Sequence, residues 1–348
     1  MRNKCKNNSI NQNKELNIGI RILRIFLSFM VVIDHFYNSK IVKNYSYIIY
    51  YHIPCFFLIS FFFTYRTLIS FNISKIKIRF ERLLIPYFCW SLIAWIKRNL
   101  YYYIRKRKFI YSIKDFSISL INGHILNVVL WFQNILILVT LLFLIIIFLF
   151  KKKYLFIFKL LYLLSYILQY SGINYFFFVK NFSTHSRSTF GRFFEAIPLA
   201  ITGFFLALHN IMEINKQNKK RVFFHSLIIL ILITKYQIFS EINNFKYGGL
   251  RLNLAAFCIF IIFSLIPSKI YGFDLKNNVI IKITNYTGGI YFTHYLIGKG
   301  FICSSTIFVK KKTILGCTII YLMSYITSCI GFKLPCLLGN SKLKHLFA

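Results

Sequence analysis

The stretch RIFLSFMVVIDHF, residues 24–36, lies within an apolar run at 17–37 that matches the length of a membrane-spanning helix. An α-helix needs about 20 largely apolar residues to cross the roughly 30 Å of hydrocarbon in a bilayer. Within this run, however, Arg24 stands near the start, and Asp34 and His35 stand near the end. Ionisable groups are rare inside membrane helices and mark either a helix end or a functional site. The stretch therefore predicts a membrane helix that also carries functional side chains.

Apolar runs of similar length recur along the chain. They predict further spans near 45–69, 82–96, 126–150, 154–170, 193–210, 222–239, 250–267, 280–302 and 313–332. With 57% hydrophobic residues, the chain has more apolar side chains than a soluble domain of 348 residues buries. We predict an all-α integral membrane protein, a bundle of about ten transmembrane helices without a soluble domain.

The chain divides into a membrane domain and two short tails. We expect a polar cytoplasmic tail at 1–16, the transmembrane domain at 17–335 and a short basic tail at 336–348. Lys and Arg are more frequent in the loops on the side of the N-terminus, which favours a cytoplasmic N-terminus. The segment KRNLYYYIRKRK, residues 97–108, opposes this bias, and its basic and aromatic mixture predicts an interfacial helix or a re-entrant stretch.

The basic charge of the chain does not indicate a nucleic-acid partner. The formal net charge is +36, but Lys and Arg are scattered through every loop rather than gathered on one face. The cysteines lie mostly inside apolar runs and lack the paired short spacings of a zinc site, so no metal is predicted.

Arg24 and His35 are eleven residues apart, which is about three helical turns and a rise of roughly 16 Å. Both side chains are therefore predicted to project from one face of the first helix. Asp34 points about 100° away and is not expected to orient His35. A simpler interpretation makes Arg24 a snorkelling residue and His35 an interfacial one.

A second polar group stands in KIKIRFERLLIPYFCWSL, residues 75–92. Arg79 and Arg82 are spaced at i and i+3, so their guanidinium groups could converge on a phosphate or carboxylate. They could instead be a basic cap on the third span. In the preceding span, Ser60 is expected to make an interhelical hydrogen bond rather than to act as a nucleophile, because no base is spaced to activate it.

Four polar or aromatic residues also stand in three later apolar runs. Any one of them could hold helices together, but as a group they suggest a lined cavity on the substrate path. They are Trp131, Glu195, Tyr291 and His294.

Over nearly its whole length, the chain resembles the membrane proteins of acyltransferase family 3, which O-acylate sugars and other exported molecules. The resemblance is carried, in chain order, by RIFLSFMVVIDHF, HIPCFFLIS, RFERLLIPYFCWSL, LWFQNILILV, IPLAITGFF, GGIYFTHYLI and LPCLL. The family has Arg or Lys, ten residues and then His in its first helix, matched by Arg24 and His35. It also has Arg-x-x-Arg before its third helix, matched by Arg79 and Arg82.

The resemblance has one departure at the second span. The family commonly has Ser-Gly where Ser60 and Phe61 stand here, so the close helix approach that a glycine permits is in question at that point.

The resemblance implies a membrane-embedded O-acyltransferase of the polysaccharide-modifying type. The acyl group, acetyl in the simplest case, would move from cytoplasmic acyl-CoA to a hydroxyl of a cell-surface or exported glycan, or of a lipid-linked sugar. His35 would be the general base, and Arg79 with Arg82 would bind the phosphates of coenzyme A. Arg24 would either stabilise charge on the donor or hold the shape of the cavity.

Two other functions fit a membrane bundle with polar groups inside. A transporter or flippase for a lipid-linked sugar or polysaccharide would also place charges around a central cavity, and it predicts discontinuous helices in symmetry-related halves. An assembly protein would use the same polar groups only to hold helices together, and would tolerate alanine at Arg24 and His35.

Overall fold

The computed structural model describes residues 18–37, 51–106, 109, 111–122, 130–170, 184–209, 216–239, 250–266, 279–303 and 313–337. Across these ranges the chain is helical, with no strand, as the sequence predicts. The helices are α2 (Ile18–Phe36), α5 (His52–Ile69), α6 (Ile73–Lys106), α7 (Ile113–Asn122), α8 (Trp131–Phe150), the short 3-10 helix η1 (Lys151–Lys153), α9 (Tyr154–Tyr170), α10 (Thr184–Leu208), α11 (Lys216–Phe239), α12 (Leu250–Ser264), α13 (Val279–Asn285), α14 (Thr287–Cys303) and α16 (Ile314–Leu337).

Helix occupies most of the described residues of each of the ten predicted spans, but fewer of the described stretches meet the length and composition of a membrane crossing. Those that do are His52–Ile69, Trp131–Leu168, Gly191–Leu208 and Ile314–Gly331. Helix α2 carries three charged residues, Arg21, Arg24 and Asp34, while α12 and α14 are short at 15 and 17 residues. Helices long and apolar enough to cross a membrane are thus present in the described part of the chain, but the count of ten crossings is not confirmed.

The stretch Trp131–Leu168 is not one straight helix. Phe143 of α8 and Phe158 of α9 have ring centroids 4.5 Å apart, although fifteen residues of continuous helix would separate them by about 22 Å. The chain reverses at Lys151, which has a positive φ of 34°. Helices α8 and α9 therefore form a hairpin, as the separate predicted spans at 126–150 and 154–170 require.

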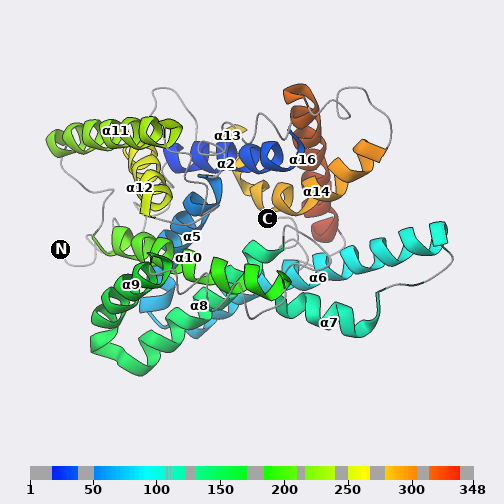
Figure 1. Cartoon of the computed structure of the whole chain (residues 1–348), viewed down its shortest axis with the longest axis horizontal. Helices are drawn as coiled ribbons and strands as arrows, with labels where there is room; N and C mark the ends of the chain where they lie inside the picture. Colours follow the sequence, from blue (N-terminus) through cyan, green and yellow to red (C-terminus); the bar gives the residue numbers. More distant parts are fainter. Residues whose placement is uncertain are drawn as a thin grey trace.

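Of the two alternatives predicted for 97–108, the re-entrant stretch is wrong as far as residue 106, where the description is interrupted, and the interfacial helix stays a prediction. Residues 97–106 continue α6, a 34-residue helix that contains Pro86. Lys, Arg and Tyr do not interrupt a helix, and the run contains no Gly or Pro that would break it. The far end of α6 extends away from the other helices together with α7 (Figure 1).

The core is aromatic where α5, α8, α9 and α10 meet. Phe61, Phe143, Phe158 and Phe204 are fully buried and pack ring against ring. Helix α5 approaches α10 closely at Gly203, where an added Cβ would lie 2.3 Å from the carbonyl oxygen of Leu58. The sequence left in question whether another helix could approach α5 closely at Phe61. In the structure α10 approaches α5 one turn earlier, at Leu58, and the glycine that permits it is Gly203 of α10.

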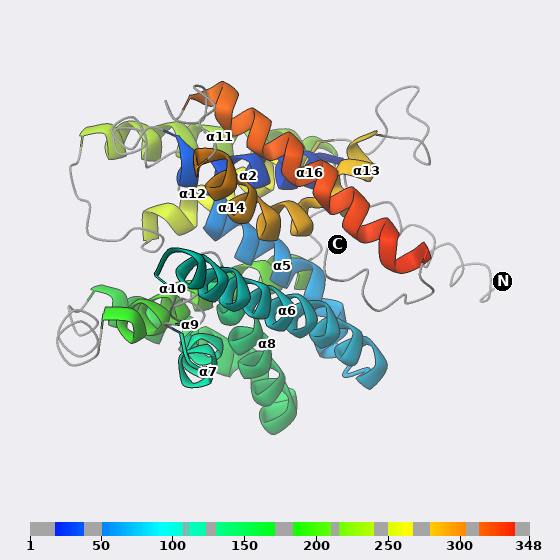
Figure 2. The same ribbon diagram turned by 90° about the vertical axis from the view of Figure 1, so that its right-hand side faces the viewer.

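A second group of helices surrounds α2. Helices α12, α13, α14 and α16 all contact it, and α16 lies across α2 and α14 (Figure 2). Gly298 of α14 allows the ring of Phe36 to approach, because a Cβ there would lie 2.3 Å from that ring. The C-terminal turn of α2, which carries His35, is therefore held directly against α14.

Candidate active site

His35 lies against His294. The two imidazole rings have centroids 5.3 Å apart and planes inclined by 27°, a stacked arrangement. His294 is fully buried in α14, whereas His35 is only partly buried near the end of α2. Helices α2 and α14 run side by side in the structure, which brings together two histidines 259 positions apart in the sequence (Figure 1).

Arg24 contacts the same helix as His35. Its Nη2 nitrogen donates a hydrogen bond of 2.9 Å to Oγ1 of Thr287, the first residue of α14. Thr287 in turn donates to the carbonyl oxygen of Thr284 in α13, so the arginine is bonded at the break between α13 and α14. The predicted common face of Arg24 and His35 is confirmed, because both side chains face α14.

Asp34 does not orient His35. It makes no hydrogen bond or ion pair with any residue in the ranges that the structure describes, which agrees with the sequence prediction.

The four predicted path residues lie in one connected group. Tyr291 is one turn before His294, with ring centroids 6.0 Å apart, and it packs on Phe132, the residue after Trp131, at 5.6 Å. The guanidinium of Arg192 lies 4.0 Å from the ring centroid of Trp131. Arg192 also interacts electrostatically with Tyr291 and Glu195. The group of polar residues thus extends from His35 across α14 to the start of α8 and the middle of α10.

Two members of this group were missed in the sequence. Arg192 precedes Glu195 by three residues, a spacing that places both on one helix face and could have identified the arginine. His52 begins α5, is buried and interacts electrostatically with His294. The feature of the sequence that could have identified His52 is its position at the edge of an aromatic-rich span.

The paired arginines of α6 have different surroundings. Arg79 donates a hydrogen bond of 2.6 Å from Nη2 to the hydroxyl of Ser60 in α5, whereas Arg82 is exposed. The expected interhelical hydrogen bond of Ser60 is confirmed, with Arg79 as its donor. One of the two predicted phosphate ligands is therefore engaged inside the bundle, and Arg82 remains at the surface.

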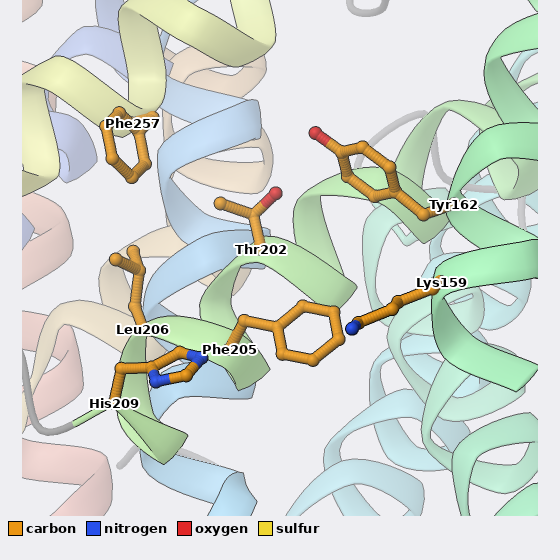
Figure 3. A pocket seen from close by; sticks show the side chains of 7 residues that line it. All are labelled: Lys159, Tyr162, Thr202, Phe205, Leu206, His209 and Phe257. Carbon is orange, nitrogen blue, oxygen red and sulfur yellow. The ribbon is translucent and has the colours of Figure 1, made fainter. Parts of the chain in front are cut away.

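A pocket in the described part of the chain lies elsewhere. It has a volume of about 400 Å³ and is lined by Lys159, Tyr162, Thr202, Phe205, Leu206, His209 and Phe257 (Figure 3). Its α10 residues begin at Thr202, seven positions and roughly 10 Å along the helix from Glu195. None of the predicted site residues lines this pocket.

Together, the apolar helices and the group of polar side chains between α2, α8, α10 and α14 describe a helical membrane protein with titratable residues inside the bundle. The family model of the acyltransferase domain of acyltransferase family 3 matches residues 17–332. The chain therefore belongs to this family and carries an acyltransferase domain. No curated protein and no solved structure matches the chain.

Proposed function

We propose that this protein is an O-acyltransferase that moves an acetyl group from cytoplasmic acetyl-CoA to a hydroxyl of a cell-surface or exported glycan. The observation that carries the proposal is the arrangement around α14, where Arg24 and His35 face one helix and His35 stacks on His294. Family membership supports acyl transfer rather than transport, although the interruption between α13 and α14 is a feature that a transporter would share.

In the proposed reaction, His35 is the general base. An ordinary imidazole is largely neutral near pH 7 and can accept the proton of the acceptor hydroxyl. The hydroxyl oxygen forms a bond to the thioester carbonyl carbon as its proton moves to His35, and the carbon–sulfur bond then breaks. The coenzyme A thiolate takes the proton from His35, so an ester and a free thiol leave the site.

A cytoplasmic donor entrance is supported by the basic end of the bundle. The α5–α6 and α8–α9 turns meet there, with Phe71 stacked on Phe148 at a centroid distance of 5.8 Å. Positive charge concentrates on the cytoplasmic side of membrane proteins. The basic residues of these two turns and of the adjoining first turns of α6 are Lys75, Lys77, Arg79, Arg82, Lys151, Lys152 and Lys153.

The acceptor would bind at the opposite end of α5. His52 begins α5 beside His294, while Ile69 ends it at the basic turns, roughly 25 Å away along the helix. In this proposal Arg82 binds donor phosphate at the surface, and Trp131, Arg192, Glu195 and Tyr291 line the acceptor side. The phosphates and the transferred acetyl group would then lie far apart, as the long arm of coenzyme A allows.

The test is acetyl transfer by full-length protein in membrane vesicles. Labelled acetyl-CoA is supplied with a panel of glycans, and the product is identified as an ester by its release in mild alkali. Label in alkali-sensitive glycan supports the proposal. Movement of a lipid-linked sugar across the membrane without acetyl-CoA would instead support the transporter.

A further inference from the structure

The two ring nitrogens of His294 have different environments. Nδ1 lies 3.1 Å from the backbone carbonyl oxygen of Ile290, one turn earlier in α14. A carbonyl oxygen can only accept a hydrogen bond, so Nδ1 carries the proton. In the neutral ring the other nitrogen, Nε2, then presents a lone pair and can only accept.

Nε2 of His294 has no hydrogen-bond partner among the residues that the structure describes, although it is completely buried. The rings of His35, Phe36 and Tyr291 surround the imidazole at centroid distances of 5.3, 6.2 and 6.0 Å. A buried acceptor without a donor is costly, and native proteins rarely leave one unpaired. Its place beside the proposed base points to a donor that arrives with the substrate.

We propose that His294 is an acceptor-positioning residue, whose Nε2 accepts a hydrogen bond from a second hydroxyl of the glycan while His35 takes the proton of the first. This inference rests on the proposed function and narrows its substrate class to compounds with two neighbouring hydroxyl donors. Because the lone pair repels carboxylate and phosphate oxygens, these groups do not occupy this position. The ring stack fixes the spacing of the two subsites.

A direct test of the ring state uses the full-length protein with ¹⁵N-labelled histidine in lipid nanodiscs. The His294→Gln variant assigns the pair of resonances by their disappearance. His225 is the matched control, since its Nδ1 lies 2.6 Å from the carbonyl oxygen of Arg221 in the same i−4 arrangement, but on the exposed surface of α11. We expect a protonated Nδ1 and a bare Nε2 for His294. A proton on Nε2 would overturn the proposal.

The functional test compares methyl glycosides with their monodeoxy derivatives as acceptors of labelled acetyl-CoA. Loss of the second hydroxyl should lower kcat/KM roughly 10- to 100-fold in the wild type, the effect of one buried acceptor left unpaired. His294→Leu should erase this discrimination, because no acceptor remains, while His294→Gln should restore part of it through its carbonyl oxygen. His225→Leu should behave as wild type.

The outcomes separate this inference from the proposed function. If His294→Leu transfers acetyl with unchanged discrimination, the second-hydroxyl subsite is wrong, but the acetyltransferase remains. If the wild type transfers no acetyl group from acetyl-CoA to any acceptor, the proposed function fails and this inference fails with it.

Discussion

The guanidinium of Arg24 donates a hydrogen bond of 2.9 Å to the hydroxyl of Thr287, and so ties α2 to the beginning of the helix that carries His294. The sequence leaves two roles open for Arg24, stabilising charge on the donor or holding the shape of the cavity. The bond to Thr287 allows an experiment to distinguish them. If Arg24 holds the shape of the cavity, removing its partner should have the same effect as removing the arginine itself.

Thr287→Val removes that hydrogen-bond acceptor and keeps the side-chain shape. We expect a loss of stability of about 1–3 kcal/mol, because a largely buried guanidinium loses a partner. The measurement is the thermal midpoint of the purified protein. Thr318→Val is the control, since Thr318 is partly exposed on α16 and bonds only the carbonyl of Ile314 in its own helix. Equal midpoints for both variants would show that the bond contributes nothing.

Arg82→Ala should raise the KM for acetyl-CoA several-fold and leave acceptor preference unchanged, because the exposed Arg82 is free to bind donor phosphate. Ser60→Ala should instead lower the thermal midpoint with little change in that KM, since it removes only the hydrogen bond from Arg79. Steady-state kinetics with varied acetyl-CoA check both variants. The reverse pattern would move Arg82 out of the donor site.

Gly203→Ala should destabilise the bundle by about 1–3 kcal/mol or prevent its assembly. The new methyl group would lie 2.3 Å from the carbonyl oxygen of Leu58, so α5 and α10 would have to separate. Gly191→Ala is the control on the same helix, because nothing lies within 4 Å of the added Cβ. Folded yield and thermal midpoint should fall only for Gly203→Ala, and equal values would contradict the close contact.

The start of α7 should weaken in acid. Ser112 and Asp115 form a capping box in which the backbone N–H of Ser112 donates to the carboxylate over 2.8 Å. That hydrogen bond holds the pKa of Asp115 below its usual value. A lowered pKa gives stability that is present above the unfolded-state pKa and is lost as the pH falls through the folded-state pKa.

Amide hydrogen exchange of residues 113–117 measures this effect. After correction for the intrinsic exchange rate, protection should decrease below about pH 4, near the ordinary pKa of an aspartate. Asp115→Asn should remove the pH dependence and leave protection low throughout. Protection that is flat with pH in the wild type would count against the capping box.

The positions of the helices could be predicted from the sequence, because each apolar run is long enough for a helix and is bounded by charged or turn residues. The sequence also placed Arg24 and His35 on one face, since that follows from helical geometry alone. Which helix they face could not be derived, because His294 is 259 positions further on and no local rule links the two. The close contact of Gly203 with Leu58 could not be predicted either, because the two residues are far apart in the sequence.

The differences between the sequence predictions and the structure have physical causes as well. The basic and aromatic mixture at 97–108 suggested a re-entrant stretch as one alternative, yet residues 97–106 are compatible with a continuous α6. For Arg79 and Arg82, the spacing left open whether both guanidinium groups bind one phosphate or form a basic cap. A neighbouring helix with a hydroxyl at Ser60 then determined that only one of them turns inward.

The central claim is that His35 is the base that accepts the proton of the acceptor hydroxyl, and its most direct test is the acetyl-transfer rate of purified His35→Ala. With His225→Ala as control and matched thermal midpoints, we expect a loss of about 10²- to 10⁴-fold in kcat, the usual contribution of a general base. Transfer by folded His35→Ala at the wild-type rate would contradict it.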